Sequence, residues 1–362
     1  MAACRGAGHV RQALMGSLLI LAAITVRTAD GHASEDDVMA LETVLVRQAA
    51  SRIDDALGTV ADSTRALGDT YARLTAAQEP DAQADTQDWM ALRKTKGSTT
   101  ELRTWQSTRE TPPAFQASFP GLYSYNGPEL SPTIRHQLNT LEALAPTIRS
   151  AYESLPYSWV YMTTADKVML IYPYVPIDEA VNNDDPTKTP FYRAANLADR
   201  SVGWTSPYLD LVGAGMMITA SYPVYTGDTL QGVMSRDMTL NELTTAILSP
   251  LHDIVGGTAL LVDDRGLAIG ASDPVLAAEI DRVNTGAGDA VLHYRTAKGL
   301  ESLAAKGVSS ASIPANSAVE LVIARNQDGS DFVRTEVNGK PVLAAPIKRT
   351  GWILVLILPA AA

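Results

Sequence analysis

One helical pattern near the start of the chain constrains the fold more than any other feature. From Ser34 to about Ala77, apolar residues recur at intervals of three, four or seven positions with charged residues between them, which is the spacing of one face of an α-helix. Ser34 and the acidic run Glu35–Asp37 supply an N-cap and a negative first turn. A helix of this length is about 60 Å long at 1.5 Å per residue, so the pattern predicts a strut rather than an ordinary core helix.

The segment before this helix has the pattern of an export signal. Ala13–Val26 is a run of 14 residues without a charge, Arg5 and Arg11 precede it, and acidic residues follow. This order indicates an N-terminus that stays in the cytoplasm and a body that is exported. We therefore predict that residues 1–33 are a signal peptide or a membrane anchor, and that the rest lies in the periplasm or outside the cell.

The sequence leaves the fate of this segment open. A run of 14 residues falls short of the ~20 that cross a bilayer, and Gly31–Ala33 offers small residues for cleavage before Ser34. Extension through Thr25–Ala29, with Arg27 at the interface, would instead give an uncleaved anchor. The two alternatives are secretion to the periplasm and anchoring in the cell membrane.

The charge balance excludes several classes of protein. The 362 residues include 29 Lys and Arg against 40 Asp and Glu, a net charge of −11, and so lack the basic surface that nucleic acid requires. The one cysteine, Cys4, can form neither an intrachain disulfide nor a cysteine-based zinc site. We expect an acidic globular protein with no nucleic-acid partner.

Beyond the long helix, the patterns predict antiparallel hairpins with helices beside them. The polar stretch Gln78–Ser118 has little periodicity, and a short helix that starts at Thr239 or Asn241 ends at Pro250. The other predicted elements are a helix over 131–155 and strands over 157–163, 167–175, 216–225, 230–238, 258–263, 267–271, 317–325, 331–337, 340–346 and 352–358. Strands joined by tight turns make this an α+β chain rather than a doubly wound parallel sheet.

An ordered set of motifs resembles a known family. The segments are Phe191–Ala195, Trp204–Asp210, Ile218–Tyr225 and Gly232–Asp237. Their order and spacing resemble the membrane-distal half of double Cache (dCache) domains, the PAS-like extracytoplasmic sensor modules of bacterial chemoreceptors, histidine kinases and cyclases. The closing segments Gly339–Ile347 and Gly351–Val355 resemble the membrane-proximal half, so the likeness covers roughly residues 34–358.

The resemblance implies an α+β fold in which a long N-terminal helix is followed by two stacked PAS-like (Cache) domains, each an antiparallel sheet with flanking helices. The expected domain limits are 1–33 for the signal peptide or anchor, 34–80 for the long helix, 81–250 for the membrane-distal domain, 251–358 for the membrane-proximal domain and 359–362 for a tail.

Family members usually bind ligands in the membrane-distal domain. Aromatic side chains supply apolar contact there, and a few polar groups fix the orientation of the ligand. The predicted ligand-binding residues are the aromatics Tyr192, Trp204, Tyr208 and Tyr222 and the charged residues Arg193 and Asp210. A structural alternative stays open, in which Phe191 and Trp204 are core, Pro207-Tyr208 is a strand corner and Asp210 is a turn residue.

One departure from the family bears on the ligand. Amino-acid-binding members place an Arg two residues before the aromatic pair, where it holds the ligand carboxylate. Here Thr189-Pro190 precedes Phe191-Tyr192, with only Lys188 nearby. Because Thr carries no charge and Lys is not a bidentate fork, the altered motif does not support an amino acid as the ligand.

Signatures of catalysis and metal binding are absent from the sequence. It contains no nucleophile elbow, phosphate-binding loop or dinucleotide fingerprint, and its five histidines are not paired at metal-ligand spacing. Asn182–Asp185 is interpreted as a solvated loop that could bind a cation, and Asn326–Asp331 fails the EF-hand pattern. We expect no enzyme activity, no cofactor and no metal.

The sequence therefore predicts an extracytoplasmic small-molecule sensing module of the dCache type that signals by conformational change. The chain stops at Pro359–Ala362 where family members continue, so we expect no output domain of its own. Expected partners are a small-molecule ligand, a membrane-bound signalling protein and a second copy of the chain through the long helix. The alternatives are a soluble periplasmic ligand-binding protein that acts through a separate receptor and, less favoured, a hydrolase with an unrecognised site.

Overall fold

The structure is a computed structural model. It describes residues 35–77, 93–102, 120–127, 129–155, 158–180, 185–210, 214–251, 256–263, 268–285, 332–337 and 339–359. The predicted signal segment, Cys4, the strand expected over 317–325 and the loop Asn326–Asp331 lie outside these ranges. The chain divides into two compact units, Thr59–Thr239 and Met1–Gly58 with Leu240–Ala362. We call them the nine-strand unit and the five-strand unit after their sheets.

The predicted long helix is confirmed. Helix α2 spans Glu35–Ala77, 43 residues, and its buried side chains, such as Leu45, Ile53, Leu57 and Leu67, follow the apolar positions of the sequence pattern. Its residues up to Gly58 belong to the five-strand unit and those from Thr59 onward to the nine-strand unit. Among the described residues, no helix is both long and apolar enough to cross a membrane.

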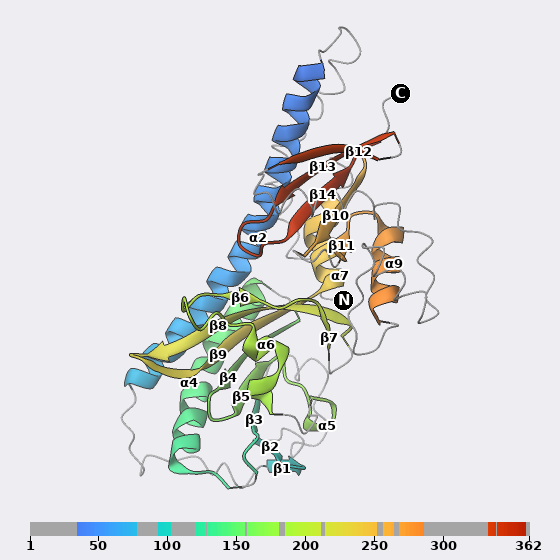
Figure 1. Ribbon diagram of the computed structural model, residues 1–362. Helices are drawn as coiled ribbons and strands as arrows, with labels where there is room; N and C mark the ends of the chain where they lie inside the picture. The colour runs from blue at the N-terminus through green and yellow to red at the C-terminus, as the bar shows by residue number, and fades with distance from the viewer. Residues whose placement is uncertain are drawn as a thin grey trace. The chain divides into compact units, whose positions relative to one another are not determined.

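The nine-strand unit is built on one antiparallel sheet (Figure 1). Its strands are β1 (Arg93–Lys96), β2 (Thr99–Leu102), β3 (Gly121–Ser124), β4 (Trp159–Thr164), β5 (Val168–Tyr172), β6 (Gly203–Trp204), β7 (Tyr208–Leu209), β8 (Met216–Thr226) and β9 (Thr229–Thr239). The order is β1-β2-β3-β5-β4-β9-β8-β6, and β7 also pairs with β8. The predicted hairpins β4–β5 and β8–β9 are confirmed.

Strands β1 and β2 lie in the polar stretch for which the sequence predicted no element. They form a hairpin around Gly97, whose φ of 60° is left-handed and easy for glycine. Every residue of β2 is buried, including Thr99, Thr100 and Glu101. The prediction failed because this buried strand is polar, so it shows no alternation of apolar and polar residues.

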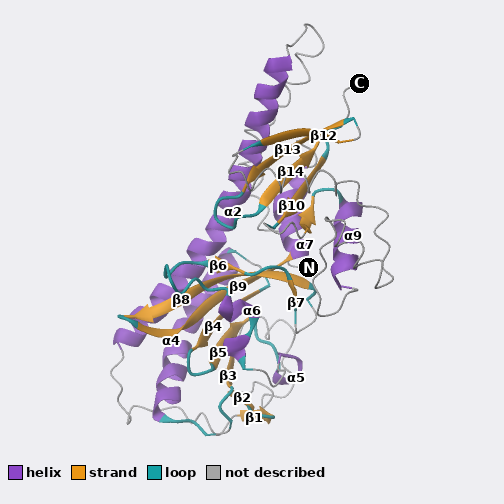
Figure 2. Ribbon diagram, in the orientation of Figure 1, coloured by secondary structure: helices purple, strands orange, loops and turns teal. Residues whose placement is uncertain are grey.

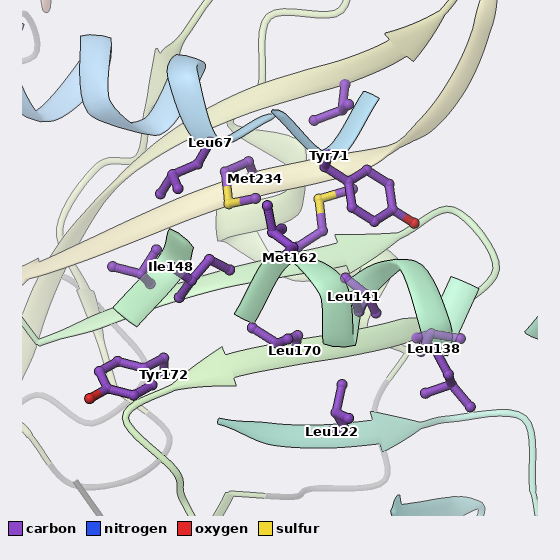
Figure 3. Close-up of a cluster of buried hydrophobic side chains, with 14 of the residues drawn as sticks. Leu67, Tyr71, Leu122, Leu138, Leu141, Ile148, Met162, Leu170, Tyr172 and Met234 are labelled. Carbon is purple, nitrogen blue, oxygen red and sulfur yellow. The ribbon is translucent and has the colours of Figure 1, made fainter. Parts of the chain in front are cut away.

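Long helices cover one face of this sheet. Helix α4 (Pro132–Ser154) begins at Ser131, whose Oγ accepts a hydrogen bond from the Ile134 backbone N at 3.3 Å. Figure 3 shows side chains of α2 and α4 packed against the strands. The cluster includes Leu67 and Tyr71 of α2, Leu138, Leu141 and Ile148 of α4, and Leu122, Met162, Leu170, Tyr172 and Met234 of the sheet. The sheet side chains of opposite parity therefore point to the other face.

Among the described residues, short segments cover that other face. They are α5 (Ile177–Ala180), the 3₁₀ turn η2 (Pro186–Lys188) and α6 (Pro190–Arg193), drawn with the sheet in Figure 2. Tyr123, Tyr161, Met169 and Ile177 form a buried apolar cluster there. The ring of Phe191 meets the ring of Tyr161 edge-on, with centroids 5.1 Å apart.

The five-strand unit is also built on an antiparallel sheet. Its sheet has the order β11-β10-β14-β13-β12, with β10 (Thr258–Val262), β11 (Ala268–Ala271), β12 (Val333–Val337), β13 (Lys340–Pro346) and β14 (Ile353–Ile357). The accompanying helices are α7 (Leu240–Leu243), the π-helical turn η3 (Thr244–Leu248) and α9 (Pro274–Thr285). Helix α9 was not predicted from the sequence, although Asp273 before Pro274 is a helix-start signal, and Asp273 Oδ1 does accept from the Leu276 backbone N at 2.8 Å.

The predicted α+β class is confirmed. The chain passes from one unit to the other between Thr239 and Leu240, where β9 ends and α7 begins, and again inside α2. The sequence had placed the boundary near residue 250, and its domain limits stay predictions.

Candidate functional site

A group of buried and half-buried polar side chains lies on the face of the nine-stranded sheet that carries the short segments. Strand alternation directs Tyr161 of β4, Thr219 of β8 and Asp237 of β9 to this face, and the register places Thr219 directly opposite Asp237. Strand β7 adds Tyr208, which pairs with Met217 of β8. We call Tyr161, Tyr208, Thr219 and Asp237 the polar cluster.

Asp237 is the centre of the polar cluster. Its Oδ1 accepts hydrogen bonds from the hydroxyl groups of Tyr161 and Thr219, each at 2.8 Å. The Tyr208 and Thr219 hydroxyl oxygens are 2.7 Å apart. Because the single hydroxyl proton of Thr219 is directed to Asp237, Tyr208 is the donor in this contact. Asp237 is only 5% exposed, and these donors offset part of the cost of removing its carboxylate from water.

Both tyrosines of the polar cluster are held in their protonated form. Burial raises the pKa of Tyr161 and of Tyr208 well above the ordinary value of 10.0, and the negative charge of Asp237 adds to the shift in each case. Deprotonation would place a second negative charge beside Asp237. The hydroxyl groups of Tyr161 and Tyr208 therefore stay protonated at neutral pH and act as hydrogen-bond donors in the cluster.

Of the sequence-predicted residues, Tyr208 lies in the polar cluster and Asp210 close by along the chain. The Asp210 Oδ2 accepts from the Ala214 backbone N, and the Asp210 backbone N donates to the Gly215 carbonyl, both at 2.9 Å. This geometry is that of a turn residue, the structural alternative considered from the sequence. Trp204 lies on β6, half-buried and opposite Ala220.

Tyr192 and Arg193 lie on α6. Tyr192 is half-buried, and its pKa is raised to about 12, first by burial and then by the negative charges of Asp166 and Asp185. Arg193 is exposed. Helix α6 packs on β8 and β9, so Tyr192 belongs to the cover of the polar face while Arg193 faces solvent.

The structure does not bring Tyr222 together with the other predicted residues. Its hydroxyl donates to Asp69 Oδ1 of α2 at 3.0 Å, and its ring packs against Gly68, where an added Cβ would lie 2.6 Å from the Tyr222 ring. Tyr222 has the strand parity of Val224, which belongs to the core under α2 and α4. Thr219 and Ser221 have the opposite parity.

Asp237, Thr219 and Tyr161 were not among the predicted site residues. Asp237 and Thr219 lie within two of the motifs that carry the family resemblance, and a period of two along each strand places them on one face. Strict application of strand alternation would have predicted that Asp237 and Thr219 share one face of the sheet and that Tyr222 lies on the other. Tyr161 carries no such signal, because its contact with Asp237 depends on the pairing of β4 with β9.

The residues considered for metal binding show no metal centre in the described part of the chain. No group of three or more His, Cys, Asp or Glu side chains is placed there to hold an ion. Asp185 instead caps η2, and its Oδ2 lies 2.8 Å from Lys167 Nζ. The rest of the Asn182–Asp185 cluster lies outside the described residues.

The nine-stranded sheet carries long helices on one face and short segments over a polar surface on the other face. This is the architecture expected of a PAS-like sensor domain. Residues 138–245, which include most of α4 and strands β4 to β9, match the family described as methyl-accepting chemotaxis protein-like, first PDC sensor domain. The resemblance to chemoreceptor sensor domains is confirmed over this segment.

Two curated proteins share shorter stretches with the chain. The methyl-accepting chemotaxis protein McpC of Bacillus subtilis (strain 168) is 34% identical over 87 residues, which are 24% of this chain and 13% of McpC. The VWFA and cache domain-containing protein CG16868 of Drosophila melanogaster is 28% identical over 104 residues, 27% of this chain and 7% of that protein. The chain thus spans a small part of the length of each relative.

Solved structures with a similar course of the chain include chemoreceptor domains. The sensory domain of the Campylobacter jejuni chemoreceptor Tlp3 has a TM-score of 0.48 at 15% identity, covering 90% of this chain and 94% of that one. The ligand-binding domain of the Pseudomonas aeruginosa PAO1 amino acid chemoreceptor PctB, in complex with L-Arg, has a TM-score of 0.46 at 17% identity, covering 90% and 96%.

Proposed function

We propose that the chain is an extracytoplasmic small-molecule sensing module whose ligand binds at the polar cluster. The observation that carries this proposal is Asp237, a buried carboxylate that accepts hydrogen bonds from the Tyr161 and Thr219 hydroxyls within the segment that matches the sensor-domain family. A buried charge of this kind costs stability, and a ligand that complements it would recover part of that cost.

The chemistry of the polar cluster favours a small ligand with a cationic amine. Asp237 supplies the opposite charge, and the tyrosine rings of the cluster offer π faces to a cation. Thr189 occupies the position where the amino-acid-binding relatives carry an Arg, and its hydroxyl donates to the Pro186 carbonyl at 2.8 Å. A ligand carboxylate would find no guanidinium fork there, so we propose an amine without an α-carboxylate rather than an amino acid.

Substitution of Asp237 tests the site. A thermal-shift screen of the whole chain against amines, amino acids, carboxylates and purines identifies a ligand by the rise in Tm. In Asp237→Asn we expect that ligand to bind about 10- to 100-fold more weakly, because a hydrogen bond to a charged group contributes about 1.5–3 kcal/mol. Titration calorimetry gives the two Kd values.

Asp62→Asn is the matched control, since Asp62 is a solvent-exposed carboxylate on α2 in the same unit. It should leave the Kd unchanged. Equal affinity of the wild type and Asp237→Asn for every ligand found would refute the assignment of the site. Trp204→Ala, Tyr208→Phe and Asp210→Asn extend the series to the contacts predicted from the sequence.

We further propose that the module is exported, acts through a membrane-bound partner and signals by conformational change without chemistry of its own. The basic and apolar N-terminal segment supports export. The exposed Val38, Met39 and Val44 of α2 support a homodimer through that helix. The mass of the mature N-terminus separates an anchored sensor from a soluble periplasmic binding protein, and light scattering measures the oligomeric state.

A further inference from the structure

The cover of the polar face is itself lightly attached. We call Asp185–Ser201 the strap. Pro186 and Ala195 are its buried residues, while Arg193 and the run 197–200 are exposed. The sheet residues of this face are far more deeply buried, at 2% exposure for Tyr161, 0% for Ser221 and 1% for Ser235. The strap, which buries little of its own surface, therefore covers polar sheet residues that are almost fully buried.

Among the described residues, the backbone N–H groups of the strap donate to carbonyls of the strap itself. Lys188 N donates to Asp185 O, Arg193 N to Thr189 O, Ala194 N to Pro190 O and Ser201 N to Asn196 O, at 3.0–3.2 Å. Movement of the whole strap would break none of these bonds. One hydrogen bond joins its middle to the sheet, from Ser221 Oγ to the Phe191 carbonyl at 2.6 Å.

Each end of the strap is tied to a hairpin turn by an ion pair. At the first end, Asp185 Oδ2 lies 2.8 Å from Lys167 Nζ in the β4–β5 turn. At the other end, Arg200 Nη2 lies 2.8 Å from Asp228 Oδ1 in the β8–β9 turn, and its guanidinium carbon lies 4.3 Å from the centre of the Tyr225 ring. The Asp228 side chain is 99% exposed and that of Arg200 is 49% exposed, and pairs this open to water are weak.

We propose that the strap is a lid, which opens as one body and gives a small molecule access to the polar face beneath it. The two ion pairs, the hydrogen bond from Arg200 Nη1 to the Gly227 carbonyl at 3.1 Å and the Ser221 hydroxyl hold it closed. Phe191, which the strap carries, contacts Tyr161, and Tyr161 in turn donates to Asp237. Access of a ligand to the polar face rests on the proposed function, whereas the opening of the strap is a property of the ligand-free chain.

Hydrogen exchange tests the opening without any ligand. In the whole wild-type chain, we expect peptides from 185–201 to exchange at least 100-fold more slowly than an unstructured peptide and at least 10-fold faster than peptides from β8 and β9, because local opening is less costly than unfolding of the sheet. Arg200→Ala and Ser221→Ala should each raise exchange in the strap by about 3- to 10-fold and leave β8 and β9 unchanged.

Thr163→Val is the matched control. Thr163 lies on the same face, and its hydroxyl is buried without a hydrogen-bond partner among the described residues, so the substitution removes no contact to the strap. The lid proposal would be contradicted if the strap exchanged its amide hydrogens at the rate of β8 and β9. It would also be contradicted if Thr163→Val raised exchange in the strap as strongly as Ser221→Ala.

A buried thiol measures access directly. In a Cys4→Ser background, Ser235→Cys places a thiol beneath the strap, and Val160→Cys places one on the opposite face of the sheet, in the core under α4. Arg200→Ala should raise the rate of modification of the first thiol by a small thiol reagent about 3- to 10-fold and leave the second unchanged. Equal changes at both thiols would indicate general destabilisation and contradict the proposal. If the lid opens but Asp237→Asn binds every ligand normally, the proposed site fails while the lid stands.

Discussion

Glu101 and Asp237 are two carboxylates buried on the same face of one sheet, and each accepts a hydrogen bond from a tyrosine. Glu101 is fully buried. Its two oxygens accept from the Tyr174 hydroxyl and from the Ile177 backbone N, so it fixes the segment between β5 and α5. Asp237 belongs to the proposed ligand site, whereas the contacts of Glu101 are those of a structural residue.

Glu101 should make stability depend on pH. Burial raises its pKa above the ordinary value of 4.5, against the lowering effects of its hydrogen bonds and of Lys94. The folded chain therefore retains this proton to a higher pH than the unfolded chain, and stability falls as the pH rises from about 4.5 through the folded pKa.

Because Gln does not titrate, Glu101→Gln should gain Tm relative to the wild type as the pH rises from 4.5 to 7. Melting curves of both proteins across this range measure the difference. Glu129→Gln, at an exposed site, should show no such trend. A difference between Glu101→Gln and wild type that does not vary with pH would contradict the prediction.

Among the elements, helix α4 depends on a residue far away in the sequence. The fully buried Arg236 of β9 donates from Nη1 to the carbonyl of Leu155 at 2.8 Å, and Leu155 is the C-cap of α4. A cation at a helix C-terminus satisfies a free carbonyl and opposes the negative end of the helix dipole. Arg236 thus joins the helix layer to the sheet within the nine-strand unit.

Arg236→Met should destabilise the nine-strand unit by about 1–3 kcal/mol, because the Leu155 carbonyl loses a charged donor in a buried setting. Urea unfolding followed by circular dichroism measures the loss. Arg193→Met is the control, since Arg193 is exposed on α6 and should cost little. Equal stabilities of the two variants would show that the cap contributes nothing.

At the scale of the whole molecule, residues from the two ends of the chain meet in the five-strand unit. Glu42 of α2 is 8% exposed, and its Oε2 lies 2.8 Å from the Nε of Arg334 on β12, 292 positions away. A second pair joins Asp54 of α2 to Arg349, whose backbone N donates to Asp54 Oδ1 at 2.8 Å. These contacts attach α2 to the sheet of that unit.

Arg334→Ala should destabilise the five-strand unit by about 1–2 kcal/mol, because it leaves the buried Glu42 carboxylate without its partner. Combining it with Glu42→Gln should cost less than the sum of the two single changes, since the double variant leaves no unpaired charge. Thermal unfolding of the four proteins completes the cycle. Strictly additive effects would mean that the pair contributes nothing.

The sequence by itself determined the elements whose periodicity is strong. The 43-residue helix, the hairpins β4–β5 and β8–β9 and the antiparallel α+β class followed from local spacing and turn residues, because these patterns reflect which side of an element is buried. The strands β1 and β2 were missed because both are polar; tertiary contacts bury the side chains of β2, and no local pattern records this.

Only the tertiary structure decided which residues gather into a site. Alternation along β8 and β9 could have paired Thr219 with Asp237 and separated Tyr222, but the approach of Tyr161 and Tyr208 depends on how β4 and β7 pair with the longer strands. The sequence carries the parity of each strand, whereas the order of strands in the sheet determines which side chains of equal parity become neighbours.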